Sequence, residues 1–307
     1  MQRKLLFAAV VLLVVGGSFL GKWWVNTGNE TPGPGPRQAN RIVSTAPSIT
    51  ETLFALGLGD RVVGRTPFCK VPPEDEGRIV EIGALLDPNL EVVVALRPDV
   101  VVVLAENEQS RFVLKELGIR SLVVSHKTVD DILESFAIMG REFGAQQKAD
   151  ALVADVKARI ERVQRKVAGR KRPRVMFSVY RSVGSGRLEA VTIAGKDDFY
   201  DRMIAIAGGE NVCLSETVLF PQVSSERILW MNPEVIIDVS RPISQTNVDR
   251  PTALKDWQQV ADVEAVRNGR VHLIDDDFAF VPGPRFILLI EKLARLLHPE
   301  LDWKEGD

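Results

Sequence analysis

The sequence predicts an α/β protein with two doubly wound lobes, mostly parallel sheets and a ligand cleft between the lobes, which are joined by one long rigid helix. Three observations support this fold class. Strand patterns alternate with helix patterns, the alternation stops at one long helical segment, and it then resumes on a similar plan. A chain of 307 residues can form two lobes. A net charge of −2 gives no reason to expect nucleic-acid binding, and two cysteines cannot form a disulfide scaffold.

The connecting helix is predicted at residues 145–169. Steps of three and four residues place its apolar side chains on one stripe, formed by Ala149, Leu152, Val153, Val156, Ile160, Val163 and Val167. Two acid–base pairs have the favourable spacing of four residues, Asp155–Arg159 and Glu161–Arg165. At about 1.5 Å per residue, this helix would be on the order of 36 Å long, roughly the width of a domain.

The first 25 residues resemble a membrane anchor or a signal peptide. Basic residues precede an apolar run from Leu5 to Leu20, which is close to the lower limit of about 17 residues for a membrane span. We favour the anchor, because the cleavage pattern is poor and two tryptophans follow the run. No cysteine follows it, which argues against a lipoprotein. Residues 26–40, rich in proline and glycine, are then a linker, and the remaining chain is expected at the periplasmic or extracellular face of the cytoplasmic membrane.

The first lobe is predicted at residues 41–144. Its strands are expected at 41–44, 61–64, 100–104 and 121–124, and its helices at 48–56, 87–97, 111–117 and 128–143. The unbroken apolar run from Val100 to Leu104 is typical of a strand buried on both faces. Ser48 and Thr128 are each followed three residues later by an acid, which is the capping-box spacing at a helix start.

The second lobe is predicted at residues 170–307. Strands are expected at 174–179, 235–238 and 271–274, and helices at 199–207, 224–231 and 285–297. Loops after strands carry Phe68, Phe220 and Phe278 in the two lobes. Each could be packing at the edge of a lobe, but three together favour a surface that stacks on a planar or bulky apolar ligand.

A carboxylate recurs at the same place in both lobes. Glu91 precedes a proline by seven residues and lies two residues after Asn89, a capping candidate; Glu226 has the same relation to Ser224 and to its own proline. A favourable charge near a helix N-terminus, worth about 0.3–1 kcal/mol, is enough to explain either glutamate alone. The repetition favours a shared role.

The sequence contains few residue patterns typical of active sites, so we expect that the protein is not an enzyme. There is no G-x-S-x-G motif, and Ala194-Gly-Lys-Asp lacks the pattern of a phosphate loop. The three histidines are dispersed, and we expect His126 to be a surface residue. The run Asp275-Asp-Asp could bind a cation, although a solvated loop is the simpler interpretation. A bridge between Cys69 and Cys213 is not expected, since these residues belong to different lobes.

Five motifs carry a resemblance to a known family: Arg41-Ile-Val-Ser-Thr-Ala-Pro-Ser-Ile-Thr-Glu, Asn89-Leu-Glu, Gly208-Gly-Glu-Asn, Pro221-Gln-Val-Ser-Ser-Glu and Pro282-Gly-Pro-Arg. In this order, over about residues 41 to 300, they resemble the helix-linked (class III) substrate-binding proteins of ABC importers. The resemblance is greatest to the vitamin B12-binding branch. Ferric-siderophore and haem binders share this fold.

The resemblance implies an extracytoplasmic monomer that delivers cobalamin or a related corrinoid to an ABC permease dimer, with no cofactor besides the transported ligand. A ferric-siderophore or haem binder is the alternative, and a metal-binding receptor or chelatase-like enzyme a more distant one. Glu91 and Glu226 match the glutamates that dock onto permease arginines. The resemblance and the loop positions together give these expected ligand contacts: Phe68, Leu85, Tyr180, Arg181, Thr192, Phe220, Asp277 and Phe278.

Overall fold

The computed structural model describes residues 39–84, 87–215, 218–239 and 248–304, which belong to one compact unit, Gln38–Asp307. The predicted anchor or signal peptide and all but the last two residues of the predicted linker lie outside these residues. In the described part of the chain, none of the helices combines the length and apolar character that crossing a bilayer requires.

The first lobe is built on a five-stranded sheet of order β3-β2-β1-β4-β5, in which neighbouring strands run parallel. Its strands are β1 (Ile42–Ser44), β2 (Val62–Arg65), β3 (Val80–Glu81), β4 (Val100–Leu104) and β5 (Ser121–Val124). Its helices are α2 (Pro47–Ala55), η1 (Gly59–Arg61), α3 (Pro73–Glu76), α4 (Leu90–Ala95), α5 (Glu108–Glu116) and α6 (Val129–Phe143). Alternate residues of β4 pack on opposite faces, Val100 and Val102 in one core cluster and Val101 and Val103 in another.

The second lobe has a mixed sheet of order β11-β10-β6-β7-β9, with β8 also paired to β6. Its strands are β6 (Arg174–Tyr180), β7 (Val191–Ile193), β8 (Glu210–Asn211), β9 (Gln222–Val223), β10 (Val235–Asp238) and β11 (Val271–Leu273). Its helices are α8 (Phe199–Ile206), α9 (Ser225–Met231), α10 (Arg250–Lys255), η3 (Asp256–Val260), α11 (Glu264–Arg267), η4 (Asp277–Ala279) and α12 (Phe286–Leu297). The predicted α/β class is confirmed, but β7 turns back and pairs antiparallel to β6 and β9, so this sheet is less parallel than expected.

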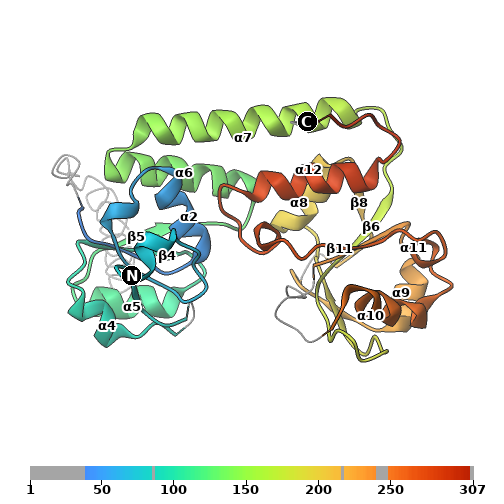
Figure 1. Ribbon diagram of the computed structural model, residues 1–307, viewed down its shortest axis with the longest axis horizontal. Helices are drawn as coiled ribbons and strands as arrows, with labels where there is room; N and C mark the ends of the chain where they lie inside the picture. The colour runs from blue at the N-terminus through green and yellow to red at the C-terminus, as the bar shows by residue number, and fades with distance from the viewer. Residues whose placement is uncertain (1–38, 85–86, 216–217, 240–247, 305–307) are drawn as a thin grey trace, which may run out of the picture. The chain divides into compact units, whose positions relative to one another are not determined.

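Helix α7 (Gln146–Val167) lies between the two sheets in the sequence and packs against α6 as well as α8 and α12 (Figure 1). Its predicted stripe faces the core, with Ala149, Val156 and Val163 fully buried. Both predicted ion pairs are present, and Arg159 also donates to both oxygens of Glu291 on α12, at 2.8 and 2.7 Å. This bidentate pair fastens the helix to the second lobe.

Three of the four predicted capping residues cap their helices, although α4 begins three residues later and α5 three residues earlier than predicted. Thr128 and Asp131 form the reciprocal capping box, and the side chains of Asn89 and Ser224 cap α4 and α9. The prediction that Ser48 caps a helix with Glu51 is wrong. Helix α2 begins one residue earlier at Pro47, a favourable first position, and the carboxylate of Glu51 is engaged elsewhere.

Candidate functional site

A chain of ion pairs joins the two lobes. Arg285, at the start of α12, donates from its two terminal nitrogens to the two oxygens of Asp277, each at 2.9 Å, and also donates to Glu51 on α2. Lys70, in the loop after β2, lies 3.0 Å from Asp277. Hydrogen bonds from Arg285 hold the pKa of the Asp277 carboxyl well below its usual range, and those to Asp277 and Glu51 raise the pKa of the guanidinium. The four side chains form the interlobe cluster.

A cavity of about 390 Å³ adjoins the interlobe cluster. Apolar side chains from both lobes supply most of its wall, and three charged residues complete it: Glu51, Phe54, Ala55, Lys70, Val71, Pro72, Pro284 and Arg285. The absence of a side chain at Gly283 allows the close approach, because a Cβ there would lie 2.8 Å from Oε2 of Glu51. The cavity thus combines apolar surface with fixed charge.

In the first lobe, the loop after β2 presents Phe68 to solvent, with 70% of the residue exposed. Buried polar groups fix this loop from inside. The guanidinium of Arg65 donates to the carbonyl oxygens of Thr66 and Cys69, at 3.2 and 3.1 Å, and Thr50 donates to the sulfur of Cys69 at 3.0 Å. The predicted exposed aromatic therefore lies on a rigid support.

In the second lobe, three strands bring predicted residues into one row. Tyr180 on β6 is paired with Thr192 on β7, and Thr192 is paired with Gln222 on β9, so their side chains share one face of the sheet. Phe220 lies two residues before Gln222 in a segment that continues alongside β7, with Ile193 N donating to Pro221 O at 3.0 Å. Tyr180 is 53% exposed and Phe220 43%. We call these four residues the β-face row.

The structure places Arg181 away from any ligand surface, contrary to the prediction. Its side chain is 1% exposed and lies between Asp238 and Asp256, at 2.7 and 2.6 Å. It also donates to the backbone oxygens of Ser182 and Ala253, at 3.1 and 2.8 Å. Four N–H···O contacts occupy the guanidinium, so the role of Arg181 is structural.

Each carboxylate of the acidic run after β11 pairs with a cation of the protein itself, although Asp275 is exposed in a loop, as the simpler interpretation expected. Asp275 pairs with Arg250, Asp276 with Lys292, and Asp277 belongs to the interlobe cluster. The ring of Phe278 packs against the core of the second lobe, with the amino group of Lys292 5.9 Å from its centroid. Leu85 lies outside the described residues.

The expectation of a surface position for His126 is wrong. The residue is 5% exposed and contacts the hydroxyl of Ser135 at 3.1 Å, and burial lowers its pKa to about 4. Cys69 and Cys213 are both buried and free. Among the described residues, no group of three or more His, Cys, Asp or Glu side chains is arranged to hold a metal ion.

Glu91 and Glu226 are both exposed in the first turn of a short helix, α4 or α9. Each helix leads directly into a strand, β4 or β10, and runs back along its sheet. The start of each helix therefore lies near the edge at which the parallel strands end, which is where α/β sheets carry their binding residues.

Sequence reasoning did not assign site roles to Glu51, Lys70, Gln222 and Arg285. Two signals were available. Arg285 ends the Pro282-Gly-Pro-Arg motif, and Gln222 lies in the Pro221-Gln-Val-Ser motif. Lys70 and Glu51 carry no comparable signal, because an isolated lysine in a loop and an acid in a first turn have ordinary local explanations.

The chain resembles known proteins both in sequence and in fold. An ABC transporter substrate-binding lipoprotein of Bacillus subtilis, YvrC, is 29% identical over 86% of this chain and 82% of its own length. The solved vitamin B12-binding protein BtuF of Vibrio cholerae has a TM-score of 0.72 at 23% identity, over 87% and 98% of the two chains. A periplasmic heme-binding protein of Pseudomonas aeruginosa has a TM-score of 0.73 at 22% identity, over 87% and 95%. The profile of the periplasmic binding protein family matches residues 42–278, and the chain belongs to that family.

Proposed function

We propose that this protein is an extracytoplasmic substrate-binding protein that delivers cobalamin or a related corrinoid to an ABC importer. The observation that carries the proposal is the exposure of large aromatic side chains on both lobes, Phe68 at 70%, Tyr180 at 53% and Phe220 at 43%. Aromatic surface of this size favours a partner that covers it. A corrin ring is broad and largely apolar on its faces.

The polar members of the β-face row suit the rim of such a ligand. Corrinoids carry amide side arms, which both donate and accept hydrogen bonds. The hydroxyl of Thr192 and the amide of Gln222 can do the same, and they lie in register beside Tyr180. The vitamin B12-binding protein of Vibrio cholerae, which shares the fold, supports the same ligand class.

One observation favours a second candidate, haem or a ferric siderophore. The phenol of Tyr180 is exposed, and a tyrosine oxygen is a known ligand of ferric iron in haem proteins. The heme-binding protein of Pseudomonas aeruginosa shares the fold to a similar degree. The two candidates therefore differ in the role of the Tyr180 phenol oxygen, which would bind iron only if the ligand is haem or a ferric siderophore.

Calorimetry on the full chain with cyanocobalamin and, separately, haemin distinguishes them. We expect saturable binding of cyanocobalamin, weakened about tenfold or more by Phe220→Ala, because truncating an aromatic hot-spot residue costs about 2 kcal/mol or more. Phe112→Ala is the matched control, since Phe112 is 65% exposed on α5 and outside the β-face row. If haemin binds, cyanocobalamin does not, and Tyr180→Phe abolishes the binding of haemin, then the ligand is haem rather than a corrinoid.

The proposal assigns Glu91 and Glu226 to docking on an ABC permease dimer by a monomer. The lobes are coupled by the interlobe cluster and by α7, which packs against helices of both. Coupled lobes hold the two carboxylates at a fixed separation, so that each can pair with an arginine of the permease. A fixed separation matters because bidentate pairing of arginine with carboxylate depends on geometry.

Uptake measurements in cells test the docking role. Glu91→Ala combined with Glu226→Ala should abolish uptake and leave ligand affinity unchanged. Glu161→Ala is the control, because this glutamate is 65% exposed on α7, away from both helix starts. Loss of ligand affinity in the double variant would contradict the assignment.

A further inference from the structure

The first lobe ends in an open strand edge. β5 is the last strand of its sheet, and no other described strand pairs with its outer side. The amide of Val101 on β4 and that of Ala105, directly after β4, donate to the oxygens of Arg120 and Val124, at 2.9 and 2.8 Å. Since backbone groups alternate along a strand, those of Ser121 and Val123 point away from β4.

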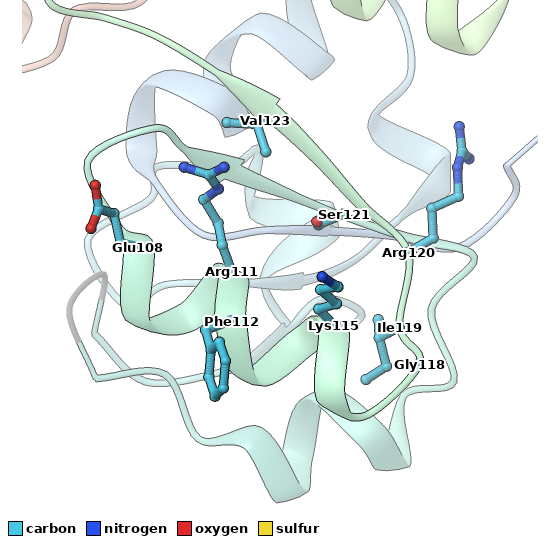
Figure 2. A pocket seen from close by; sticks show the side chains of 9 residues that line it. All are labelled: Glu108, Arg111, Phe112, Lys115, Gly118, Ile119, Arg120, Ser121 and Val123. Carbon is cyan, nitrogen blue, oxygen red and sulfur yellow. The ribbon is translucent and has the colours of Figure 1, made fainter. Parts of the chain in front are cut away.

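A cavity of about 810 Å³ lies along this edge, between β5 and α5. Figure 2 shows its lining, which includes both outward-facing strand residues and three cations: Glu108, Arg111, Phe112, Lys115, Gly118, Ile119, Arg120, Ser121 and Val123. Arg111 and Lys115 extend from the side of α5 that faces the strand, whereas Phe112 points away from it (Figure 2). The lining carries three positive side chains and one negative side chain.

The cations differ in how far they are engaged. Arg120 forms an ion pair with Glu142, and Arg111 makes a long contact of 3.4 Å with the oxygen of Ala105. Lys115 has no ion-pair partner among the described residues, and its exposure leaves the ammonium in solvent. Arg111 and Lys115 therefore retain donors for an external anion.

The spacing of these two cations matches an added strand. Four residues of α-helix advance about 6 Å, and two residues of a β-strand advance about 6.6 Å. Val123 packs on the same core cluster as Leu114 of α5, so the α5 side is one face of the sheet. An acid at every second position of a strand beside β5 would thus face Arg111 and Lys115 in turn.

We infer that the groove between α5 and β5 binds an extended acidic segment of another polypeptide, which adds to the sheet beside β5. Backbone pairing with Ser121 and Val123 supplies affinity, and the two cations select acids at alternate positions. The chain's own residues 26–37 do not fit, because they contain one acid, Glu30, and carry proline at 32, 34 and 36, which removes every second amide donor.

The test uses the full chain and a capped heptapeptide, Thr-Glu-Thr-Glu-Thr-Glu-Thr, with the corresponding lysine peptide as control. The glutamate peptide should bind and slow hydrogen exchange at the amides of Ser121 and Val123, measured by NMR. Arg111→Glu with Lys115→Glu should weaken binding at least tenfold. Lys157→Glu with Arg170→Glu, two exposed positions near α7 with the same change in charge, should alter it less than twofold.

A further variant and the comparison of the two peptides distinguish addition of a strand to the sheet from attraction between charges alone. Val123→Pro removes an outward amide while leaving the bonds to β4, and should weaken the glutamate peptide several-fold. Equal binding of both peptides, or binding without protection of Ser121 and Val123, would overturn the inference. So would binding of vesicles containing phosphatidylglycerol through Arg111 and Lys115 when the glutamate peptide does not bind.

Discussion

Two arginine–carboxylate clusters in this protein have similar chemistry and opposite settings. The cluster around Arg181 lies inside the second lobe, with side chains of Arg181, Asp238 and Asp256 all at most 1% exposed. The cluster around Arg285 joins two lobes, and the side chains of Arg285 and Asp277 are 38% and 29% exposed. The first can only stabilise its own lobe, whereas the second contributes to how the lobes are held together.

The difference explains which arginine a ligand can reach. Asp256 also accepts the amides of Gly184 and Gly186, each at 2.7 Å, and Asp238 accepts the indole N–H of Trp257 at 3.0 Å. Every polar group of that cluster is thus used in building a loop and a core. The interlobe cluster borders a cavity, so an anionic group on a ligand can exchange with its carboxylates.

The largest effect is expected for Arg181→Met. Removing the guanidinium leaves two buried carboxylates facing each other, which should lower the free energy of unfolding by about 3–5 kcal/mol. Urea denaturation measures the loss. Arg187→Met is the control, because Arg187 is 75% exposed and should change stability by no more than about 0.5 kcal/mol. A loss below about 1 kcal/mol for Arg181→Met would mean that the buried cluster contributes no more to stability than the interlobe cluster.

Asp198 is a third case, a buried carboxylate without an arginine. The residue is 5% exposed, its Oδ2 has no hydrogen-bond partner among the described residues, and burial raises its pKa to about 7. An acid with a raised folded-state pKa contributes stability below its unfolded pKa of about 3.9, and that contribution is lost as pH rises through about 7.

Asp198→Ser keeps a capping oxygen at the start of α8 and removes the unpaired one. The variant should gain stability relative to wild type by about 1–2 kcal/mol at pH 8 and by little at pH 4. Thermal unfolding across this pH range gives the comparison. A difference that is constant with pH would show that the carboxylate does not titrate there.

A smaller effect is expected for Arg285→Met. Because its side chain is more than one third exposed, the loss in unfolding free energy should be about 1 kcal/mol or less. The folded-state pKa of Asp277 is lowered, so the contribution is present above the unfolded pKa of about 3.9 and is lost only as pH falls below it. Urea denaturation at pH 7 provides the test. A loss equal to that of Arg181→Met would contradict the different settings of the two clusters.

The smallest effect per residue on stability is expected for Glu91→Ala with Glu226→Ala. Both side chains are exposed, and each is worth no more than a favourable charge near a helix start, about 0.3–1 kcal/mol. Urea denaturation of this double variant should therefore give a midpoint close to that of wild type. A loss above about 2 kcal/mol would mean that the carboxylates build the lobes rather than a docking surface.

Local patterns in the sequence were sufficient for much of the fold. The apolar run of β4 and the stripe of α7 each extend over enough residues to define a period, and both were predicted within a few residues. β8 and β9 have two residues each and β7 has three, which is too short for any period, so the mixed sheet was missed.

The site was predicted less completely than the fold, for a related reason. Phe68 and Phe220 were recognised as aromatic residues in loops. The pair of Glu51 and Arg285 joins residues 234 positions apart, and no local pattern reveals such a contact. Arg181 was misassigned because its two carboxylate partners lie 57 and 75 residues away, so its burial was not visible in the sequence.

Hydrogen exchange of the full chain with and without cyanocobalamin tests the central claim most directly, since peptide-resolved mass spectrometry reports both lobes in one experiment. With cyanocobalamin bound, we expect slower hydrogen exchange at residues 66–70 in the first lobe and 219–223 in the second, with no change around Arg181. Protection confined to one lobe, or centred on the buried Arg181 cluster, would contradict a ligand held between the lobes.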